Sequence, residues 1–121
     1  MTLNEELAGR VRAALARVRH VEEKKMFGSI AFMVNKKMCV TVGHDRLMCR
    51  IDPELHDAAL QRPGARTVKM KGRAYKGFVY VSGESLKSKS DLDYWLKLAR
   101  AFNKRAKSSG QRTRRDPRTS L

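Results

Sequence analysis

The chain has 121 residues, of which 41% are hydrophobic and 32% are charged, and its formal net charge is +15. This length and composition predict one soluble globular domain with a core of its own, and no apolar run approaches the roughly 20 residues that a membrane-spanning helix needs. The amino terminus, MTLNEELAGR, is polar and acidic, unlike a secretory signal, so we expect a cytoplasmic protein with no membrane partner. The positive charge would concentrate polyanions near the chain, so DNA or RNA is the first partner to consider. The alternative is a basic surface without a partner.

An amphipathic helix is predicted over the first part of the chain, ending near His20. Thr2 and Glu5 have the spacing of a capping box. Apolar residues then recur at helical spacing, at Leu3, Leu7, Val11, Ala14, Leu15 and Val18. The segment Val21 to Lys25 is charged and is predicted to be a connection.

Three strands separated by two tight turns are predicted between Met26 and Ile51. The first strand, around Phe32, is apolar at every position from Ile30 to Val34, which predicts burial on both faces. Asn35 opens the first turn, because asparagine tolerates a positive φ better than most residues.

The second turn sets the register of the next hairpin. A two-residue loop at His44-Asp45 creates one wholly apolar face, on which Val42 is opposite Leu47, Val40 opposite Cys49, and Met38 opposite Ile51. The other face then holds Cys39, Thr41, Arg46, Met48 and Arg50. In this register the two cysteines lie on opposite faces, so we expect no disulfide between them.

The second half of the chain predicts two more strands between two helices. Asp52-Pro53 is a typical helix start and Pro63-Gly64 a typical end. Strands are predicted at Thr67 to Lys71 and at Phe78 to Val81, joined by a basic turn from Gly72 to Gly77. A polar loop, GESLKSKSD, precedes a final helix capped by Ser90, whose apolar stripe is Leu92, Trp95, Leu96, Ala99, Phe102 and Ala106. The predicted fold is an α+β two-layer sandwich with an antiparallel sheet of about five strands, in the order α-β-β-β-α-β-β-α.

The folded domain is predicted to span residues 1–106, and residues 107–121 a disordered tail. The tail, KSSGQRTRRDPRTSL, has no periodicity and almost no apolar residues. It holds five cationic residues and one acid, so most of the +15 belongs to the folded part.

Basic residues on the outer sheet face, the basic turn and the tail are the candidate contact surface for nucleic acid or a partner protein. They are Arg46, Arg50, Lys69, Lys71, Arg73, Lys76, Arg112, Arg114 and Arg115. Phe32 or Tyr75 could add stacking on bases. The alternative is that the strand charges only oppose aggregation at sheet edges.

No catalytic, cofactor-binding or metal-binding residues are predicted. The spacing of Cys39 and Cys49 matches no zinc pattern or CxxC motif. His44 and Asp45 are neighbours in a turn without a nucleophile, and the glycine-containing turns match no phosphate-binding fingerprint. We therefore expect a protein that is not an enzyme and needs no cofactor.

Three blocks carry a family resemblance: KKMFGSIAFMVNKKMCV at Lys24 to Val40, DRLMCRI at Asp45 to Ile51, and KGRAYKGFVYV at Lys71 to Val81. With the helix end LKLARAF, they resemble the amino-terminal domain of the TfoX (Sxy) family of competence regulators over roughly residues 5–106. The sequence departs from the family pattern at Ser29 (a second glycine), at Lys36 (the glycine of an Asn-Gly turn), and at Ala74-Tyr75 (proline and methionine). The resemblance implies a small antiparallel sheet with helices on one face and supplies no catalytic residues.

The resemblance also shapes the functional expectation. Family members that activate competence genes carry a second, helical domain, for which this sequence has no room, so we expect a stand-alone amino-terminal domain. The leading hypothesis is a non-enzymatic regulatory or adaptor domain in transcription or competence regulation. Its expected partners are a regulatory protein or a second copy of the chain, held through the second apolar sheet face. The alternative is nucleic-acid binding through the basic surface and tail.

Overall fold

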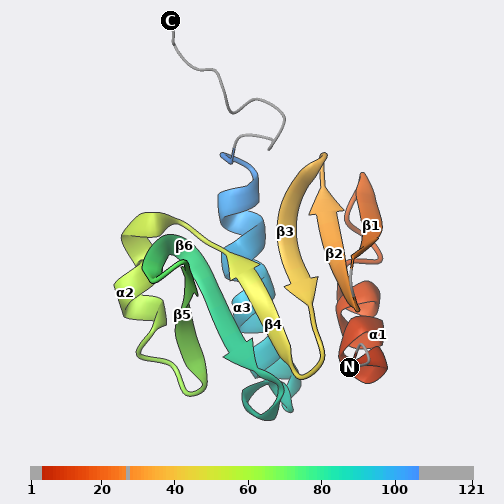
Figure 1. Cartoon of the computed structure of the whole chain (residues 1–121). Helices are drawn as coiled ribbons and strands as arrows, with labels where there is room; N and C mark the ends of the chain where they lie inside the picture. The colour runs from red at the N-terminus through yellow and green to blue at the C-terminus, as the bar shows by residue number, and fades with distance from the viewer. Residues whose placement is uncertain (1–3, 27, 107–121) are drawn as a thin grey trace, which may run out of the picture.

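A computed structural model describes residues 4–26 and 28–106, which form a six-stranded antiparallel sheet with helices on one face (Figure 1). The sheet order is β1-β2-β3-β4-β6-β5, and α3 crosses behind β3 and β4 in this view. The elements are α1 (Glu5–Ala14), β1 (Val21–Met26), β2 (Ser29–Val34), β3 (Lys37–Val42), β4 (Arg46–Arg50), a 3₁₀ turn (Pro53–Leu55), α2 (His56–Ala59), β5 (Ala65–Met70), β6 (Arg73–Ser82), a second 3₁₀ turn (Gly83–Leu86) and α3 (Lys89–Asn103). The predicted α+β class is confirmed, with one strand more than expected.

The additional strand is β1, which was predicted to be a connection. It pairs with β2 along its whole length, with Lys24 opposite Ala31, and forms one edge of the sheet. Its sequence, VEEKKM, is nearly all charged, so it carries no apolar alternation that a sequence pattern could detect. Charged side chains suit an edge strand because they oppose pairing with another chain.

Helix α1 is shorter than predicted. Its N-cap is Asn4, whose side chain accepts a hydrogen bond from the Leu7 amide at 3.0 Å, and the helix ends at Ala14 rather than near His20. His20 adopts a positive φ of 62°, which a helix cannot accommodate. The predicted cap Thr2 lies outside the described residues.

Strand β2 is buried on both faces, as its sequence predicts. Phe32 is fully buried in the core, and Ala31 and Met33 on the opposite face are only 2% and 8% exposed. The turn after β2 has positive φ at both Asn35 (53°) and Lys36 (64°), which confirms the predicted tight turn. Because this burial occurs within one chain, it does not itself require a second copy.

The predicted register of β3 with β4 is confirmed where the two strands pair. Val40 is opposite Cys49 and Val42 opposite Leu47. The prediction fails at Met38, which pairs with Met33 of β2 and has no partner on β4. The cause is a β-bulge at Cys39, since Phe32 pairs with Val40 and the next residue, Met33, with Met38.

The bulge also changes the position of Cys39. Its side chain is fully buried in the same core cluster as Cys49, so its predicted place on the outer face was wrong. Both thiols are free. An extra residue in a strand reverses the alternation of side chains, and the strand's sequence gave no sign of it.

The last two strands are longer than predicted. Strand β6 begins at Arg73 rather than Phe78, and the turn before it consists of Lys71 (φ 51°) and Gly72 (φ 77°). The predicted basic turn from Gly72 to Gly77 therefore belongs mostly to a strand.

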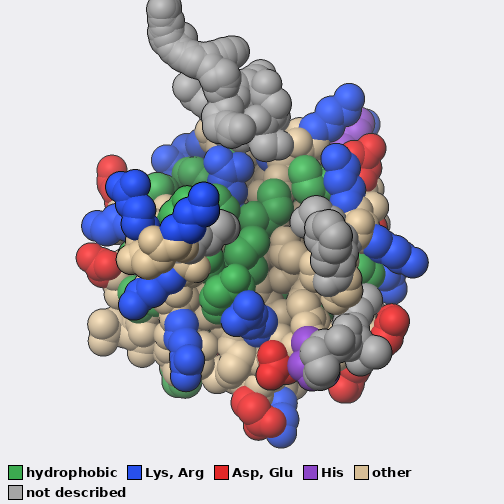
Figure 2. Space-filling model, viewed as in Figure 1, with side chains coloured by type: hydrophobic (Ala, Val, Ile, Leu, Met, Phe, Trp, Pro, Cys, Tyr) green, Lys and Arg blue, Asp and Glu red, His purple; other side chains and the backbone are tan. Residues whose placement is uncertain are grey.

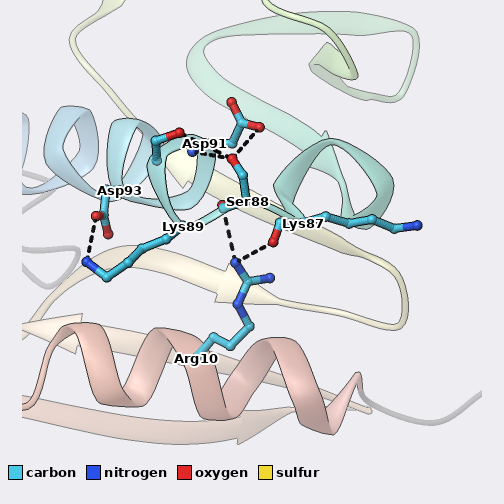
Figure 3. Close-up of polar contacts among 7 residues, drawn as sticks. Arg10, Lys87, Ser88, Lys89, Asp91 and Asp93 are labelled. Carbon is cyan, nitrogen blue, oxygen red and sulfur yellow. Dashed lines mark hydrogen bonds and ion pairs between the residues drawn. The ribbon is translucent and has the colours of Figure 1, made fainter.

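Helix α3 supplies most of the predicted core stripe, although Phe102 is only half-buried and the buried Ala106 follows the end of the helix. Leu92, Trp95, Leu96 and Ala99 are buried. Its N-cap is Ser88 rather than Ser90, with the Ser88 hydroxyl accepting from the Asp91 amide at 3.1 Å (Figure 3). The Arg10 guanidinium of α1 donates to the carbonyl oxygens of Lys87 and Ser88 at 3.4 and 3.3 Å, which ties the two helices together on one side of the sheet.

Candidate contact surface

The outer face of the sheet, opposite α3, carries an apolar strip that consists of Met48, Phe78 and Tyr80. The strip lies between Arg46 and Arg50. The register of β4 with β6 places Met48 opposite Tyr80 and Arg50 opposite Phe78, so these side chains share that face. Figure 2 shows a band of hydrophobic side chains across the middle of this face, with Lys and Arg side chains over the β5–β6 side.

Tyr80 is the centre of a cationic surface that we call the outer basic surface: Arg46, Arg66, Lys69 and Tyr80. The guanidinium carbon of Arg46 lies 3.6 Å from the centroid of the Tyr80 ring, a cation–π contact. Arg66 of β5 is opposite Tyr80 in the sheet. These residues line a shallow hollow of about 700 Å³, completed by Leu60, Ala65 and Thr67.

None of the residues that line this hollow is acidic, and among the described residues none of its three cations forms an ion pair. Several cations around one aromatic ring create a positive electrostatic potential, which favours the binding of an anionic group. The surface can therefore bind an acidic or phosphate-bearing partner.

Arg50 is packed more tightly than a surface contact residue. Its guanidinium carbon lies 5.8 Å from the Phe78 ring and 5.5 Å from the Phe102 ring of α3. Arg50 is the last residue of β4 and follows Cys49, the last residue of that strand that pairs with β3. Figure 1 shows α3 behind these two strands. Burial lowers the pKa of Arg50 from its usual value. Because Arg50 packs against one ring of the sheet and one ring of α3, it contributes to the packing between them.

The other predicted cations of the folded part lie on the hairpin of β5 and β6, and all of them are exposed: Lys69, Lys71, Arg73 and Lys76. Tyr75 is 42% exposed among them, and its ring meets that of Phe78 edge to face at 6.4 Å. The hairpin is thereby joined to the apolar strip of the outer face.

Of the two aromatic residues expected to stack on bases, only Tyr75 is accessible. The prediction that Phe32 could stack on bases was wrong, because Phe32 is fully buried in the core between the sheet and the helices. Arg112, Arg114 and Arg115 lie outside the described residues. Tyr80 and Arg66 were missed, since their importance follows from the pairing of β6 with both β4 and β5, which no local pattern reveals.

His56 and the two cysteines lie inside the protein. His56 is 3% exposed, and its Nδ1 accepts from the Gly77 amide at 2.9 Å while its Nε2 lies 2.8 Å from Thr67 Oγ1. Burial raises the pKa of the Cys39 thiol to about 11 and that of Cys49 further. Within the part of the chain that the structure describes, no group of three or more metal-binding side chains is found, and no helix is long and apolar enough to cross a membrane.

A family model described as the TfoX N-terminal domain matches residues 13–103, which includes all six strands, α2 and α3. At the level of the family, this match supports a regulatory, competence-related domain. Comparison with curated proteins and with solved structures found no match.

Proposed function

Because this chain belongs to the TfoX N-terminal domain family, we propose that it is a non-enzymatic regulatory domain in transcription or competence regulation. It contacts its partner with the outer basic surface and the adjoining apolar strip. The partner is a regulatory protein that presents acidic side chains.

The observation that carries this proposal is the set of cations around Tyr80, which form no ion pair with any described residue. Arg46 is stacked on that ring, so its guanidinium is held in one place without a carboxylate. Complementary charge steers association and fixes the register of a complex. Met48 and Phe78, partly buried beside Tyr80, supply the apolar contact area that the centre of an interface needs.

A binding role is favoured over catalysis by the state of the reactive side chains. Both thiols are buried, and their raised pKa values keep them protonated near neutral pH. His56 engages both ring nitrogens in contacts that hold β5 and β6.

Site-specific crosslinking tests the proposal. A photoreactive phenylalanine analogue at position 80 is expected to crosslink a partner protein in cells, and Arg46→Glu in the same chain is expected to abolish the product. The matched control carries the analogue at Lys97, which is exposed on α3. Equal crosslinking from both positions, or a product that survives Arg46→Glu, would contradict the proposal.

Nucleic-acid binding is the second candidate, favoured by the exposed Tyr75 among the four hairpin cations. An aromatic side chain beside cations matches the stacking and phosphate contacts of proteins that bind single strands. Fluorescence anisotropy of labelled DNA and RNA across a salt series decides between binding and no binding. For contacts with phosphates, the logarithm of the association constant falls linearly with the logarithm of the salt concentration. The candidate predicts a steep slope that Lys76→Ala reduces and an affinity that Tyr75→Ala lowers without changing the slope. It fails if no binding is seen at low salt.

A further inference from the structure

A second cationic hollow lies on the helix side of the sheet, at the end where α3 finishes. It measures about 500 Å³, and its polar lining comes from two segments far apart in the sequence together with Asn35 of the turn between β2 and β3. The connection between α1 and β1 contributes Arg17, Arg19 and His20, and the end of α3 contributes Arg100, Asn103 and Lys104. We call it the helix-side hollow.

The fold holds the first of these segments in place. The Asn35 amide donates to the His20 carbonyl oxygen at 3.0 Å, which joins the connection to the turn between β2 and β3. His20 and Asn35 both adopt positive φ, at 62° and 53°, so each backbone changes direction at this contact. The arginines before His20 are thereby presented to the same space as the last turn of α3.

Among the described residues, the lining of the hollow is cationic. Its lining holds four formal cations and no acidic residue. Two acids of the described residues pair with cations outside the lining, Glu23 with Arg12 and Asp52 with Arg105. Glu22 lies beside His20 and Asn35 in an adjoining hollow and does not line this one. Among the described residues, none of the four lining cations forms an ion pair. The dipole of α3 stabilises cations at its own carboxyl end, but it does not account for Arg17 and Arg19, which approach from another segment.

The hollow also contains a buried polar group with unused hydrogen-bonding capacity. Asn103 is 3% exposed, and its Nδ2 donates to the Lys37 carbonyl oxygen at 3.4 Å. Its second N–H has no acceptor among the described residues. Buried amides are normally fully bonded, and Asn103 lines the hollow, which makes this N–H a candidate donor to a ligand oxygen.

We propose that the helix-side hollow binds a phosphate-bearing ligand. Guanidinium groups from two sides match the oxygens of a phosphate in bidentate geometry, and the free Asn103 N–H can donate to another oxygen. The volume lies within the range of about 300–1,000 Å³ that small-molecule sites occupy. This inference does not depend on the proposed function, since no residue of the outer basic surface takes part.

Titration calorimetry on the full chain at low salt tests this inference, with pyrophosphate, ATP and a short single-stranded DNA as probes. Saturable one-to-one binding is expected from at least one probe. The variant Arg17→Gln with Arg100→Gln is expected to weaken it about tenfold or more, since charge-assisted hydrogen bonds are lost. The matched control is Lys97→Gln with Lys25→Gln, which removes the same charge at two exposed positions outside the hollow, and its affinity is expected to stay within about twofold.

The probes separate the sources of the phosphate. Binding of pyrophosphate and ATP indicates a small phosphorylated ligand, whereas binding of DNA alone indicates a nucleic-acid backbone. Thermal unfolding gives an independent readout: without ligand, Arg17→Gln with Arg100→Gln is expected to be at least as stable as the unsubstituted chain, because like charges are removed. The proposal is overturned if no probe saturates, or if both double variants lose affinity equally.

A failure of this proposal is distinguishable from a failure of the proposed function. Amide chemical-shift changes on adding pyrophosphate should cluster at residues 17–20, 35 and 103. Changes confined to residues 46–50 and 78–80 would place phosphate on the outer basic surface instead and would refute a site in the helix-side hollow.

Discussion

The guanidinium carbon of Arg46 lies 3.6 Å from the centre of the Tyr80 ring, although the two residues belong to different hairpins. They meet because β6 pairs with β4, which places Tyr80 opposite Met48 and diagonal to Arg46. The ring takes the place of a carboxylate partner, so the guanidinium is held while its charge stays available. This relationship makes the outer face a candidate for contact with anions.

The Arg46–Tyr80 contact is expected to couple the two residues energetically. In a double-mutant cycle with Arg46→Ala and Tyr80→Ala, the coupling free energy of unfolding should be about 0.5–1 kcal/mol, typical of an exposed cation–π pair. Urea unfolding of the four proteins measures it. Lys69→Ala with Tyr80→Ala is the control and should be additive; an additive result for Arg46 as well would show that the stacking carries no energy.

The hydrogen bonds of His56 are expected to hold α2 against β5 and β6. His56→Ala should lower the free energy of unfolding by about 3 kcal/mol, because it opens a cavity and leaves the buried Gly77 amide without an acceptor. Thr67→Val removes only the hydroxyl partner and should cost about 1 kcal/mol. Chemical denaturation of both variants compares these values, and equal small losses would argue against the buried hydrogen bond.

Asp52 is expected to make stability depend on acid pH. The backbone amide of Glu54 and the Arg105 guanidinium lower its pKa below the usual 3.8. The folded state therefore binds fewer protons, so the stabilisation is present above about pH 3.8 and is lost as pH falls through the lowered pKa. Asp52→Asn should be less stable near neutral pH, and the difference should vanish in acid. A difference that stays constant with pH would contradict this assignment.

The two thiols are expected to be inert in the folded protein and to weaken it at high pH. Neither should react with Ellman's reagent until denaturant is added, because both side chains are fully buried. Burial raises the pKa of the Cys39 thiol from 9.0 to about 11. Between these two pH values the unfolded chain loses the thiol proton and the folded chain keeps it, so the free energy of unfolding is unaffected below about pH 9 and falls as pH rises towards 11. Cys39→Ala should flatten that decline, and rapid labelling of the native protein would contradict the burial.

The sequence predicted those features that short-range patterns determine. The apolar run from Ile30 to Val34, the Asn35 turn and the Val40–Cys49 register follow from alternation and turn preference, and all three are confirmed. Strand β1 was missed because an edge strand of charged residues has no alternation. Cys39 was misplaced because the bulge shifts the strand residues that precede Val40 to the other face, whereas Val40 and Val42 keep their predicted face. Tyr80 was missed because its contacts come from pairing between distant strands.

The most direct test of the regulatory role is a comparison of transcript levels in cells that carry the chain. Deletion is expected to change a defined set of transcripts, which the unsubstituted chain restores and Arg46→Glu with Arg66→Glu does not. Lys97→Glu with Lys25→Glu makes the same change in net charge away from the outer basic surface and should restore them. Restoration by the outer-surface variant, or no transcript change on deletion, would contradict the account.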